Sequence, residues 1–550
     1  MLALNGARVG GPPPAVVGQA EGCPMRVTMF VYNNCTADVR VLREAAALRD
    51  TGHQVRIIAV LDGTTEPSEW RDGIRIDRID RNPPHYPLLR WSRRVRRGAR
   101  LARASLRRRR RRLIRRARAR VSLTLRRRVR GARRRAAVVR RGWRVAGDRL
   151  VRRLRGVRTL RPLLVMAGRA LRTRRAPPAA QRPRPQPVPA PLARATEATG
   201  PASSELMKPA PASARRGRPL VERALMTLHK PLMFLDYYWR AYRLCGREPA
   251  NVYHAHDLNT LPVAAAAARS TGGKLVYDAH ELYTEISTLS RRERRVWRRL
   301  ERLLIGRADA TISVCDSIAE ELSKRYGVQR PTVVLNCPSG PRPVSRRPEL
   351  LRRAAGLRSE GAAVVLYQGG FVPHRGLPEL VRASRWFDGA TLVMMGWGRL
   401  EQELRRLVEE EELAGVVRFA PPVSQRELLT HSAGADVGVI PYQAVGLNNF
   451  YTTPNKLFEY MAAGLPIAAS RFPELVRFVE GLEVGRTFDP TRPRDIAAAV
   501  NGILADDAAR DAMRERALAA ARTYCWEREA PRVVDLYAGL APAGLAVAQR

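Results

Sequence analysis

The sequence predicts an α/β protein with two tandem, doubly wound domains, the first of which contains a long Arg-rich and Pro-rich insertion. Short apolar runs alternate with segments of helical periodicity before residue 85 and again after residue 221, which is typical of parallel sheets covered by helices. The chain has 550 residues, too many for one ordinary core, and 45% of them are hydrophobic, which excludes a wholly disordered protein. Its net charge of +48 is concentrated in the insertion.

The first domain is predicted to comprise residues 25–85 and 221–345, after a flexible leader over residues 1–24. A helix from about Thr36 should end near Gly52, because glycine favours the end of a helix. The strands on both sides of the insertion are expected to share one sheet and to cover residues 27–31, 55–60, 74–76, 252–254, 275–277, 310–314 and 333–335.

Residues 86–220 are predicted to be an insertion into this domain. Between residues 90 and 175 there are 37 arginines, no lysine and one acid, Asp148, so this stretch alone carries +36. Eleven prolines follow between residues 177 and 219, a composition typical of an extended linker.

The second domain is predicted over residues 346–522, with helices over residues 523–550 that return to the first domain. Two doubly wound domains in tandem place a cleft at the carboxyl ends of their strands, where ligands of open α/β sheets bind. The expected strands cover residues 363–367, 392–395, 416–419, 437–440 and 467–469.

A short helix after residue 453 carries the most informative candidate residues. Thr453 suits its N-cap, Pro454 its first position and Gly464 its end. Lys456 and Glu459 are three residues apart and share one face. A cation and a carboxylate beside a helix N-terminus suit a phosphorylated sugar, and the alternative is a surface ion pair on an ordinary helix.

A glycine pair provides a second candidate site in the same domain. Gly369 and Gly370 follow a predicted strand, where glycine permits close approach of the backbone to a phosphate. Arg375 precedes a helix and can reach the same anion. The alternative is a plain connection from strand to helix.

Two histidine-containing segments close predicted strands of the first domain: His254-Ala-His256-Asp257 and Asp278-Ala-His280-Glu281. Such positions face the cleft, which makes His256 and His280 candidates for acceptor binding or proton transfer. The alternative is a hydrogen-bonded histidine at the rim of the core. No third metal ligand with suitable spacing is evident, so no metal is predicted.

The six cysteines form no Cys-x-x-Cys pair, which argues against a zinc ribbon and fits a reducing cytoplasm. No run approaches the about 18 apolar residues that a membrane span needs, and the first 25 residues lack the core of a signal peptide. We therefore expect a cytoplasmic protein whose membrane contact, if any, is peripheral.

The order of these segments resembles the retaining, GT-B-fold glycosyltransferases of family GT4 over roughly residues 26–85 and 221–540. The elements that carry the resemblance are Asp38-Val-Arg40 with Gly52-His53, His254-Ala-His256-Asp257, Asp278-Ala-His280-Glu281, Leu335-Asn-Cys-Pro338, the loop from Gly369 to Gly376, Met395-Gly-Trp-Gly398 and the segment from Asn455 to Gly464.

The resemblance implies two Rossmann-like domains that transfer a sugar from a nucleotide-diphosphate sugar to an acceptor with retention. It implies no cofactor and no metal on an Asp-x-Asp motif, which the sequence lacks. His256 and Glu459 would be the catalytic residues. The residues that would bind the donor are Gly369, Gly370, Arg375, Asn455, Lys456 and Glu459, and the acceptor-side candidates are Asn33, Asn34, Asp38, His254, His280 and Glu281.

This sequence departs from the family pattern in three places. The first of the family's two glutamates falls on Tyr451, and the arginine of the glycine-rich loop falls on Gly370, which leaves Arg375 in place of a lysine. The residues Asn33 and Asn34 replace an amino-terminal glycine-rich turn.

The acceptor is expected to be a lipid-linked or cell-envelope glycan. For residues 90–175 two interpretations lead: a solvated insertion without a partner, whose many arginines reflect coding bias, and contact with an anionic membrane at its inner face. Nucleic acid is the less favoured partner of this stretch, because aromatic residues are few. Two other functions stay open: a nucleic-acid-binding protein acting through the insertion, and a nucleotide-sugar-binding protein without turnover.

Overall fold

The computed structural model describes residues 24–81, 228–340, 348–358 and 361–541, with a few positions between residues 83 and 138. The chain divides into two compact units, residues 1–84 with 201–550 and residues 85–200, and the description below concerns the first unit. The predictions for the leader, for the Pro-rich linker and for nearly all of the Arg-rich stretch lie outside the described residues.

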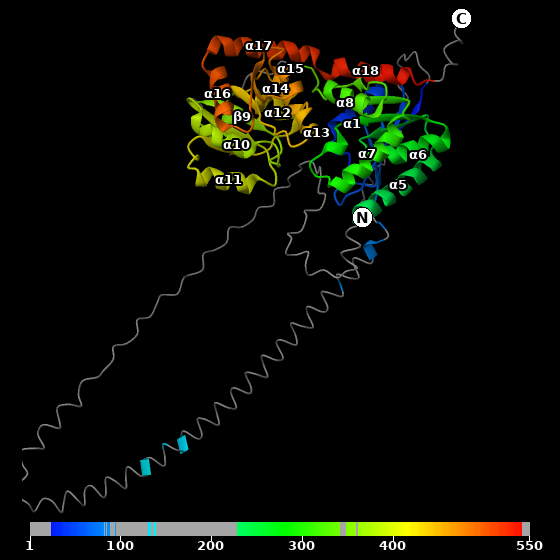
Figure 1. The fold of residues 1–550 in the computed structure, drawn as a ribbon, viewed down its shortest axis with the longest axis horizontal. Coiled ribbons are helices and arrows are strands. Elements are labelled where there is room, and N and C mark those ends of the chain that lie inside the picture. The colour runs from blue at the N-terminus through cyan, green and yellow to red at the C-terminus, as the bar shows by residue number, and fades with distance from the viewer. Residues whose placement is uncertain are drawn as a thin grey trace, which may run out of the picture. The chain divides into compact units, whose positions relative to one another are not determined.

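The amino-terminal sheet has eight strands in the order β3-β4-β2-β1-β5-β6-β7-β8, and all neighbours are parallel except β3 with β4 (Figure 1). β1 pairs with β5, which confirms that strands on both sides of the insertion share one sheet. The strands are β1 (Arg26–Phe30), β2 (Gln54–Val60), β3 (Ser68–Arg71), β4 (Ile74–Ile79), β5 (Val252–His256), β6 (Lys274–Ala279), β7 (Ala310–Ser313) and β8 (Thr332–Val333).

Helices cover both faces of this sheet (Figure 1). The first begins later than Thr36, at Val39, because the Asp38 side chain accepts a hydrogen bond from the backbone of Val41 and caps the helix. The elements are α1 (Val39–Asp50), α5 (His229–Arg247), α6 (Leu261–Thr271), the 3₁₀ turn η1 (Tyr283–Glu285), α7 (Arg291–Ile305) and α8 (Asp316–Tyr326).

The carboxyl-terminal sheet has six parallel strands in the order β11-β10-β9-β12-β13-β14. The sequence did not predict β14, because this short strand mixes a glycine, an arginine and a threonine with one buried phenylalanine. The strands are β9 (Ala363–Gln368), β10 (Ala390–Met395), β11 (Val417–Ala420), β12 (Val437–Ile440), β13 (Ile467–Ser470) and β14 (Gly485–Phe488).

Ten helical elements of the described chain accompany the second sheet. Chain order reverses at β9, which has β10 on one side and β12 on the other, so its carboxyl end marks the usual ligand position. The helical elements are α9 (Pro348–Ala354), α10 (Leu377–Ala383), η2 (Ser384–Trp386), α11 (Glu401–Glu410), α12 (Gln425–Ser432), α13 (Leu447–Phe450), α14 (Asn455–Ala462), α15 (Pro473–Val479), α16 (Pro493–Leu504) and α17 (Asp507–Thr523).

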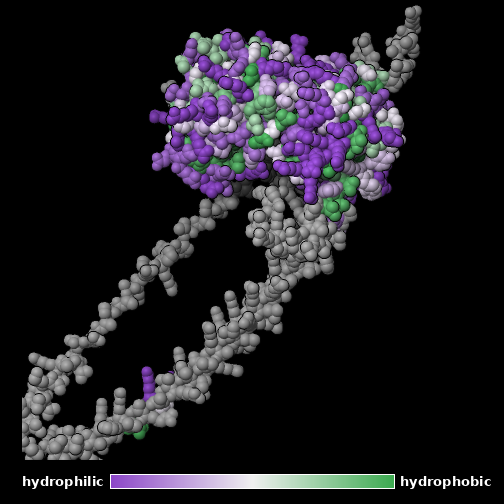
Figure 2. Space-filling model, in the orientation of Figure 1, coloured by the Kyte–Doolittle hydropathy of each residue, from purple (hydrophilic) through white to green (hydrophobic). Residues whose placement is uncertain are grey.

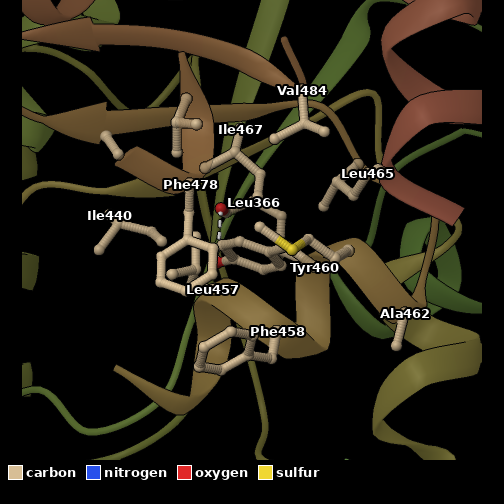
Figure 3. Packing of buried hydrophobic residues seen from close by; sticks show 14 of the residues in the cluster. Leu366, Ile440, Leu457, Phe458, Tyr460, Ala462, Leu465, Ile467, Phe478 and Val484 are labelled. Atoms are coloured by element: carbon tan, nitrogen blue, oxygen red, sulfur yellow. Dashed lines mark hydrogen bonds between the residues drawn. The ribbon is translucent and has the colours of Figure 1, made fainter. Parts of the chain in front are cut away.

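The core beneath α14 fixes the direction of that helix. Leu457, Phe458 and Tyr460 are buried on its inner side, and Figure 3 shows them packed among Ile467, Phe478 and other apolar side chains. The Tyr460 hydroxyl donates a hydrogen bond to the backbone oxygen of Leu366 (3.2 Å), which joins the helix to β9. Burying each of these side chains contributes about 1.5–3 kcal/mol, so α14 has one stable orientation.

The last described helix, α18 (Trp526–Ala538), crosses back to the first sheet. Val533 and Tyr537 are buried in the same core as Val41 and Leu48 of α1. The Tyr537 hydroxyl lies 2.8 Å from Nδ1 of the fully buried His254. The carboxyl-terminal segment therefore contributes to the stability of the amino-terminal sheet.

Within the described chain, no helix combines the length and the apolar character needed to cross a bilayer. Five cysteines are described, all of them buried and free: Cys35, Cys245, Cys315, Cys337 and Cys525.

We predict that Tyr537→Phe lowers the free energy of unfolding by about 1–3 kcal/mol, because His254 keeps its buried ring nitrogen and loses the hydroxyl partner. Urea denaturation followed by circular dichroism measures the change. The control is Tyr242→Phe, at a residue that is 41% exposed, and equal stability of the two variants would contradict the prediction.

A candidate active-site cleft

A cleft of about 510 Å³ lies between the two sheets at the carboxyl ends of their central strands. The amino-terminal domain contributes Asp38, Arg40, His280, Glu281 and Asn336, and the carboxyl-terminal domain contributes residues of the β9 and β10 loops together with α14. Another hollow, of about 580 Å³, is lined by residues such as Arg471 and Asp489 of the second domain alone. The interdomain cleft is the better candidate, because charged groups from two domains converge on it.

Several hydrogen bonds cross between the domains around this cleft. Asn448 accepts from the backbone of Leu282 (2.8 Å) and donates to Glu281 (3.0 Å). Asn336 donates to Asn455 at 3.0 Å. These contacts join the two walls of the cleft directly.

Helix α14 brings Lys456 and Glu459 to the cleft, and both of them line it. The helix begins at Asn455 with Pro454 as its N-cap, so the expectation of a Thr453 cap was wrong by one residue. The Thr453 hydroxyl donates instead to the backbone oxygen of Val314 (3.3 Å) in the other domain. Asn455 is exposed at the rim of the cleft.

Lys456 is a buried cation, only 7% exposed, and no carboxylate of the described residues lies within ion-pair distance of it. Its ammonium nitrogen lies 3.8 Å from the centre of the Tyr367 ring and 5.2 Å from that of Tyr442. Burial lowers the pKa of Lys456 well below its ordinary value, the charge of Arg375 lowers it further, and the charge of Glu459 opposes both effects. An anion bound in the cleft would favour the charged form of Lys456 and so raise its pKa.

Arg375 is the second cation of this wall. Its guanidinium carbon lies 3.9 Å from the centre of the Tyr442 ring, so one aromatic ring touches both cations. No carboxylate of the described residues lies within ion-pair distance of Arg375, although its charge opposes the rise that burial causes in the pKa of Glu281. Two like charges kept side by side on a concave wall favour a ligand with more than one negative charge.

Glu459 is partly exposed to the cleft, and its Oε2 accepts a hydrogen bond from Nε2 of Gln368 (2.7 Å). Burial raises the pKa of Glu459, and hydrogen bonds from Gln368 and Gln425 oppose that rise. Gln368 thus fixes the carboxylate and leaves its other oxygen for a hydroxyl donor.

The glycine loops approach each other closely at the carboxyl ends of β9 and β10. Gly396 has φ +152°, and a Cβ there would lie 2.0 Å from the backbone oxygen of Gly369. Gly369 (φ +120°) lines the cleft beside Lys456. Gly370 does not line it, contrary to expectation, because its peptide turns inward and its oxygen accepts from the Tyr367 hydroxyl (3.0 Å).

The opposite wall is built on the buried pair of Arg40 and Asp278. Arg40 donates to both carboxylate oxygens of Asp278 at 2.9 Å, and to the backbone oxygen of Val334 at 2.7 Å. His280, which lines the cleft, places Nε2 2.8 Å from the same carboxylate. Burial alone would lower the pKa of His280, but Asp278 and Asp257 outweigh it and raise this pKa to about 10.

His254 and His256 do not line the cleft, contrary to expectation. Both lie on one side of β5, where their rings stack with centres 4.2 Å apart, and they are 0% and 1% exposed. Nδ1 of His256 lies 3.0 Å from Nε2 of His280, so His280 separates it from the cleft. Nε2 of His256 is buried without a hydrogen-bond partner, which leaves one polar atom of this ring available.

The other acceptor-side candidates divide into two groups. Asp38 and Glu281 line the cleft. Asn33 and Asn34 do not, because their side chains shape the turn after β1: Asn33 bonds to Asp38 (2.8 Å) and Asn34 to Asp62 (2.7 Å).

The described residues bring four potential metal ligands within 4.8 Å of one another: Glu44, His254, His256 and Asp278. The sequence reasoning missed this group, because Glu44 and Asp278 are remote in sequence from the His-x-His segment. The carboxylate oxygens of Asp278 are already hydrogen-bonded to Arg40 and His280, and Arg40 also forms an ion pair with Glu44 (3.0 Å). The chemistry of the group does not fit a metal, since a cation there would adjoin a buried guanidinium.

Comparison with known proteins decides the family. Residues 192–338 match the model of Glycosyltransferase Family 4, and residues 351–519 match the model of Glycosyl transferases group 1. The chain belongs to the GT4, group 1 glycosyltransferase family. The second match includes the wall with Arg375, Lys456 and Glu459, and the first includes His280, Glu281 and Asn336 of the opposite wall but not Asp38 and Arg40.

The D-inositol 3-phosphate glycosyltransferase of Nocardioides sp. is 30% identical over 260 residues, which cover 43% of this chain and 55% of that protein. The glycogen synthase of Mycobacterium tuberculosis is 26% identical over 299 residues, which cover 52% of this chain and 68% of that protein. This GT4-family chain therefore spans little more than half the length of the first of these relatives.

Two solved structures show the same fold. Sucrose-phosphate synthase from Thermosynechococcus elongatus superposes with a TM-score of 0.58 at 14% identity, covering 94% of this chain and 98% of that one. A glycosyltransferase from Rickettsia africae gives 0.51 at 10% identity, covering 95% and 100%. The prediction of two Rossmann-like domains in the GT-B arrangement is confirmed.

Sequence reasoning missed several residues of this GT4-family cleft as site residues, among them Arg40, Gln368 and Trp397. Arg40 and Trp397 belong to the motifs on which the family resemblance rests. Their positions beside Asp38 and beside the glycines after β10 could have indicated that they line the cleft. Gln368 ends a buried strand, and only its contact with Glu459 distinguishes it from other polar strand ends.

We predict that the stability advantage of the wild type over His280→Gln shrinks as the pH rises from about 6.5 to about 10. The pKa of His280 is raised in the folded protein, so its stabilising charge is fully present below the unfolded pKa of about 6.5 and is lost towards about 10. Thermal midpoints of both proteins across this range measure the effect. His431→Gln, at a partly exposed histidine on α12, is the control, and a difference between wild type and His280→Gln that does not change with pH would contradict the prediction.

Proposed function

We propose that this protein transfers a glycosyl group from a nucleotide-diphosphate sugar to an acceptor hydroxyl, with retention and without a metal. The observation that carries the proposal is the pair Lys456 and Arg375: two cations on one cleft wall with no carboxylate partner among the described residues. Burying a cation without an opposite charge costs free energy of folding. Two neighbouring cations in this state therefore indicate a ligand that supplies the negative charge.

The departing diphosphate explains why the cations would accelerate the reaction. When the bond between the anomeric carbon and the diphosphate oxygen breaks, its electron pair moves to that oxygen. The acceptor oxygen bonds to the anomeric carbon on the same face, and the acceptor proton passes to the departing phosphate. Lys456 and Arg375 would stabilise the charge that grows in this step more than they stabilise the bound donor.

Glu459 is proposed to hold the nucleotide ribose. Its carboxylate is fixed by Gln368 and lies on the helix face that also presents Lys456. Asn455 and the backbone of Gly369 complete the proposed donor side, and both line the cleft. Glu459 therefore acts on the donor through hydrogen bonds rather than by proton transfer.

The acceptor is proposed to enter along the wall that carries Asp38, His280 and Glu281. Carboxylates accept hydrogen bonds from sugar hydroxyls, and His280 donates to a negative oxygen while it carries a proton. His256 lies directly behind His280, with its Nδ1 3.0 Å from Nε2 of that ring, and is proposed to act on the reacting sugar through His280. A lipid-linked or cell-envelope glycan is the proposed acceptor class, because a hydroxyl-rich ligand suits this polar wall.

A cytoplasmic location is proposed, supported by five free, buried cysteines among the described residues, which suit a reducing compartment. Contact of residues 90–175 with an anionic membrane stays a prediction from their charge, and these residues lie almost wholly outside the described ones. The rival function as a nucleic-acid-binding protein rests on that same stretch alone. No observation in the cleft favours it.

We predict that a panel of nucleotide-diphosphate sugars contains one donor from which the full-length protein releases nucleoside diphosphate, faster when an acceptor glycan is present. A coupled assay of released diphosphate reports turnover. Binding of a nucleotide sugar without release would instead favour a binding protein without turnover, and neither binding nor release across the panel would refute the proposal.

We predict that Lys456→Met weakens binding of the nucleoside diphosphate by about 10- to 100-fold, because it removes a charge-assisted contact. Isothermal titration calorimetry measures this affinity. Lys324→Met, at an exposed lysine near the end of α8, is the matched control. Equal affinities of the two variants would exclude the proposed role of Lys456.

A further inference from the structure

Helix α5 carries a stripe of apolar side chains that faces away from the protein. Leu235, Trp239 and Tyr242 are 60%, 56% and 41% exposed. They recur every three to four residues and so lie along one side of the helix. The opposite side, with Tyr237 and Cys245, is buried in the core. The stripe is therefore additional to the helix face that folds against the sheet.

Helix α7 presents a matching outer face that is strongly basic. Val296 and Leu303 are 62% and 63% exposed and lie two turns apart, with Arg299 between them. The helix contains seven arginines against two glutamates, a net charge of +5, and α5 contains four cations against one aspartate, a net charge of +3. Both helices thus combine exposed apolar groups with excess positive charge.

The two helices adjoin, so these faces belong to one surface. The Phe234 and Trp297 rings meet edge to face with centres 5.3 Å apart, and Lys230 pairs with Glu293 at 2.8 Å. We call the outward side chains of the two helices the α5–α7 surface; it is defined by Leu235, Trp239, Tyr242, Val296, Arg299 and Leu303. Figure 2 shows hydrophobic side chains over α5 next to the hydrophilic surface over α7.

We propose that the α5–α7 surface docks on an anionic lipid bilayer. Large apolar side chains gathered on one outer face indicate an interaction site rather than a random exposure. Trp and Tyr suit the region of lipid headgroups, and arginine side chains extend their charge to phosphates while their stems lie against apolar groups. Arg243 already has this arrangement, with its guanidinium carbon 4.9 Å from the centre of the Trp239 ring.

The net charge of the α5–α7 surface and the types of its side chains indicate which partner it binds. A net +8 spread over two helices requires a partner with distributed negative charge, which excludes an ordinary neutral protein surface. Three of the five apolar side chains of this surface, Leu235, Val296 and Leu303, are aliphatic and offer no ring for stacking on bases, so the surface suits a hydrocarbon layer better than nucleic acid. An anionic bilayer satisfies both requirements, since it combines phosphates with an accessible apolar layer.

The α5–α7 surface is linked to the acceptor wall of the cleft through the η1 turn. Arg298 of α7 pairs with Glu285 of η1, and Arg325 of α8 pairs with the same carboxylate at 3.0 Å. The η1 turn directly follows His280 and Glu281 of the acceptor wall. Docking would therefore hold the acceptor side of the cleft close to the lipid, whatever the donor is, so the inference does not depend on the proposed function.

The test uses the full-length protein with an environment-sensitive fluorophore on Leu235→Cys in a Cys23→Ser background. The other five cysteines are buried, so labelling is confined to residue 235. Vesicles of phosphatidylcholine with phosphatidylglycerol should shift the emission to the blue, and added salt should reverse the shift. The same fluorophore on Leu518→Cys, an exposed position of α17, should not respond.

A charge-reversal pair tests the basic half of the surface. Arg295→Glu with Arg299→Glu should lower vesicle partition by at least about 25-fold, on the basis of about fivefold for each lost charge. Arg522→Glu with Arg528→Glu, at exposed arginines of the carboxyl-terminal helices, makes the same change in net charge and should leave partition at residue 235 nearly unchanged.

Three results would overturn the inference. Sedimentation with vesicles while the fluorophore at residue 235 stays in water would assign binding to another part of the chain. An equal blue shift on pure phosphatidylcholine would exclude the dependence on anionic lipid. A blue-shifted fluorophore without vesicles, together with a dimer mass in light scattering, would assign the surface to a second copy of the chain.

Discussion

The structure of the cleft depends on one energetically unfavourable arrangement, the burial of the Lys456 ammonium group beside Arg375 without a carboxylate partner from the described residues. Two tyrosine rings, Tyr367 and Tyr442, supply the electrostatic compensation. The apolar side of α14 supplies the packing that keeps the lysine from turning to solvent. The free energy that holds this helix against β9 therefore also maintains an anion-attracting wall.

The amino-terminal wall differs from the lysine wall, because its buried charges neutralise each other. Arg40 and Asp278 form a fully buried pair, and His280 extends that pair to the surface of the cleft. A buried pair of this kind is weak evidence for stability, but its two charge-assisted hydrogen bonds restrict the orientation of both side chains. Its effect is to hold one imidazole at a defined place and in a protonated state opposite the lysine wall.

The sequence was sufficient to predict the fold, since nearly every strand appears as a short apolar run and the two series of runs repeat the same alternation. It also indicated that Lys456, Glu459 and Arg375 lie at the cleft, because Pro454 and Gly464 bracket α14 and a glycine turn precedes the arginine. It failed where sequence distance hides contact. Alternation along β5 places His254 and His256 on one side but does not reveal that His280 covers them. Likewise, Gly370 and Asn34 are residue types that are common in binding loops. Only the hydrogen bonds of the Gly370 backbone and of the Asn34 side chain show that they point away from the cleft.

The return of α18 to the first sheet has a mechanical consequence. The polypeptide passes between the halves twice, near Pro338 and near Trp526, and the two crossings are bonded together: the amide of Trp526 donates to Pro338 (2.9 Å), and that of Gly340 donates to Glu527 (2.7 Å). Two crossings bonded together in this way form a hinge between the halves. Any swing of one half against the other would take place about this line, and the gap would widen most at the edge farthest from it.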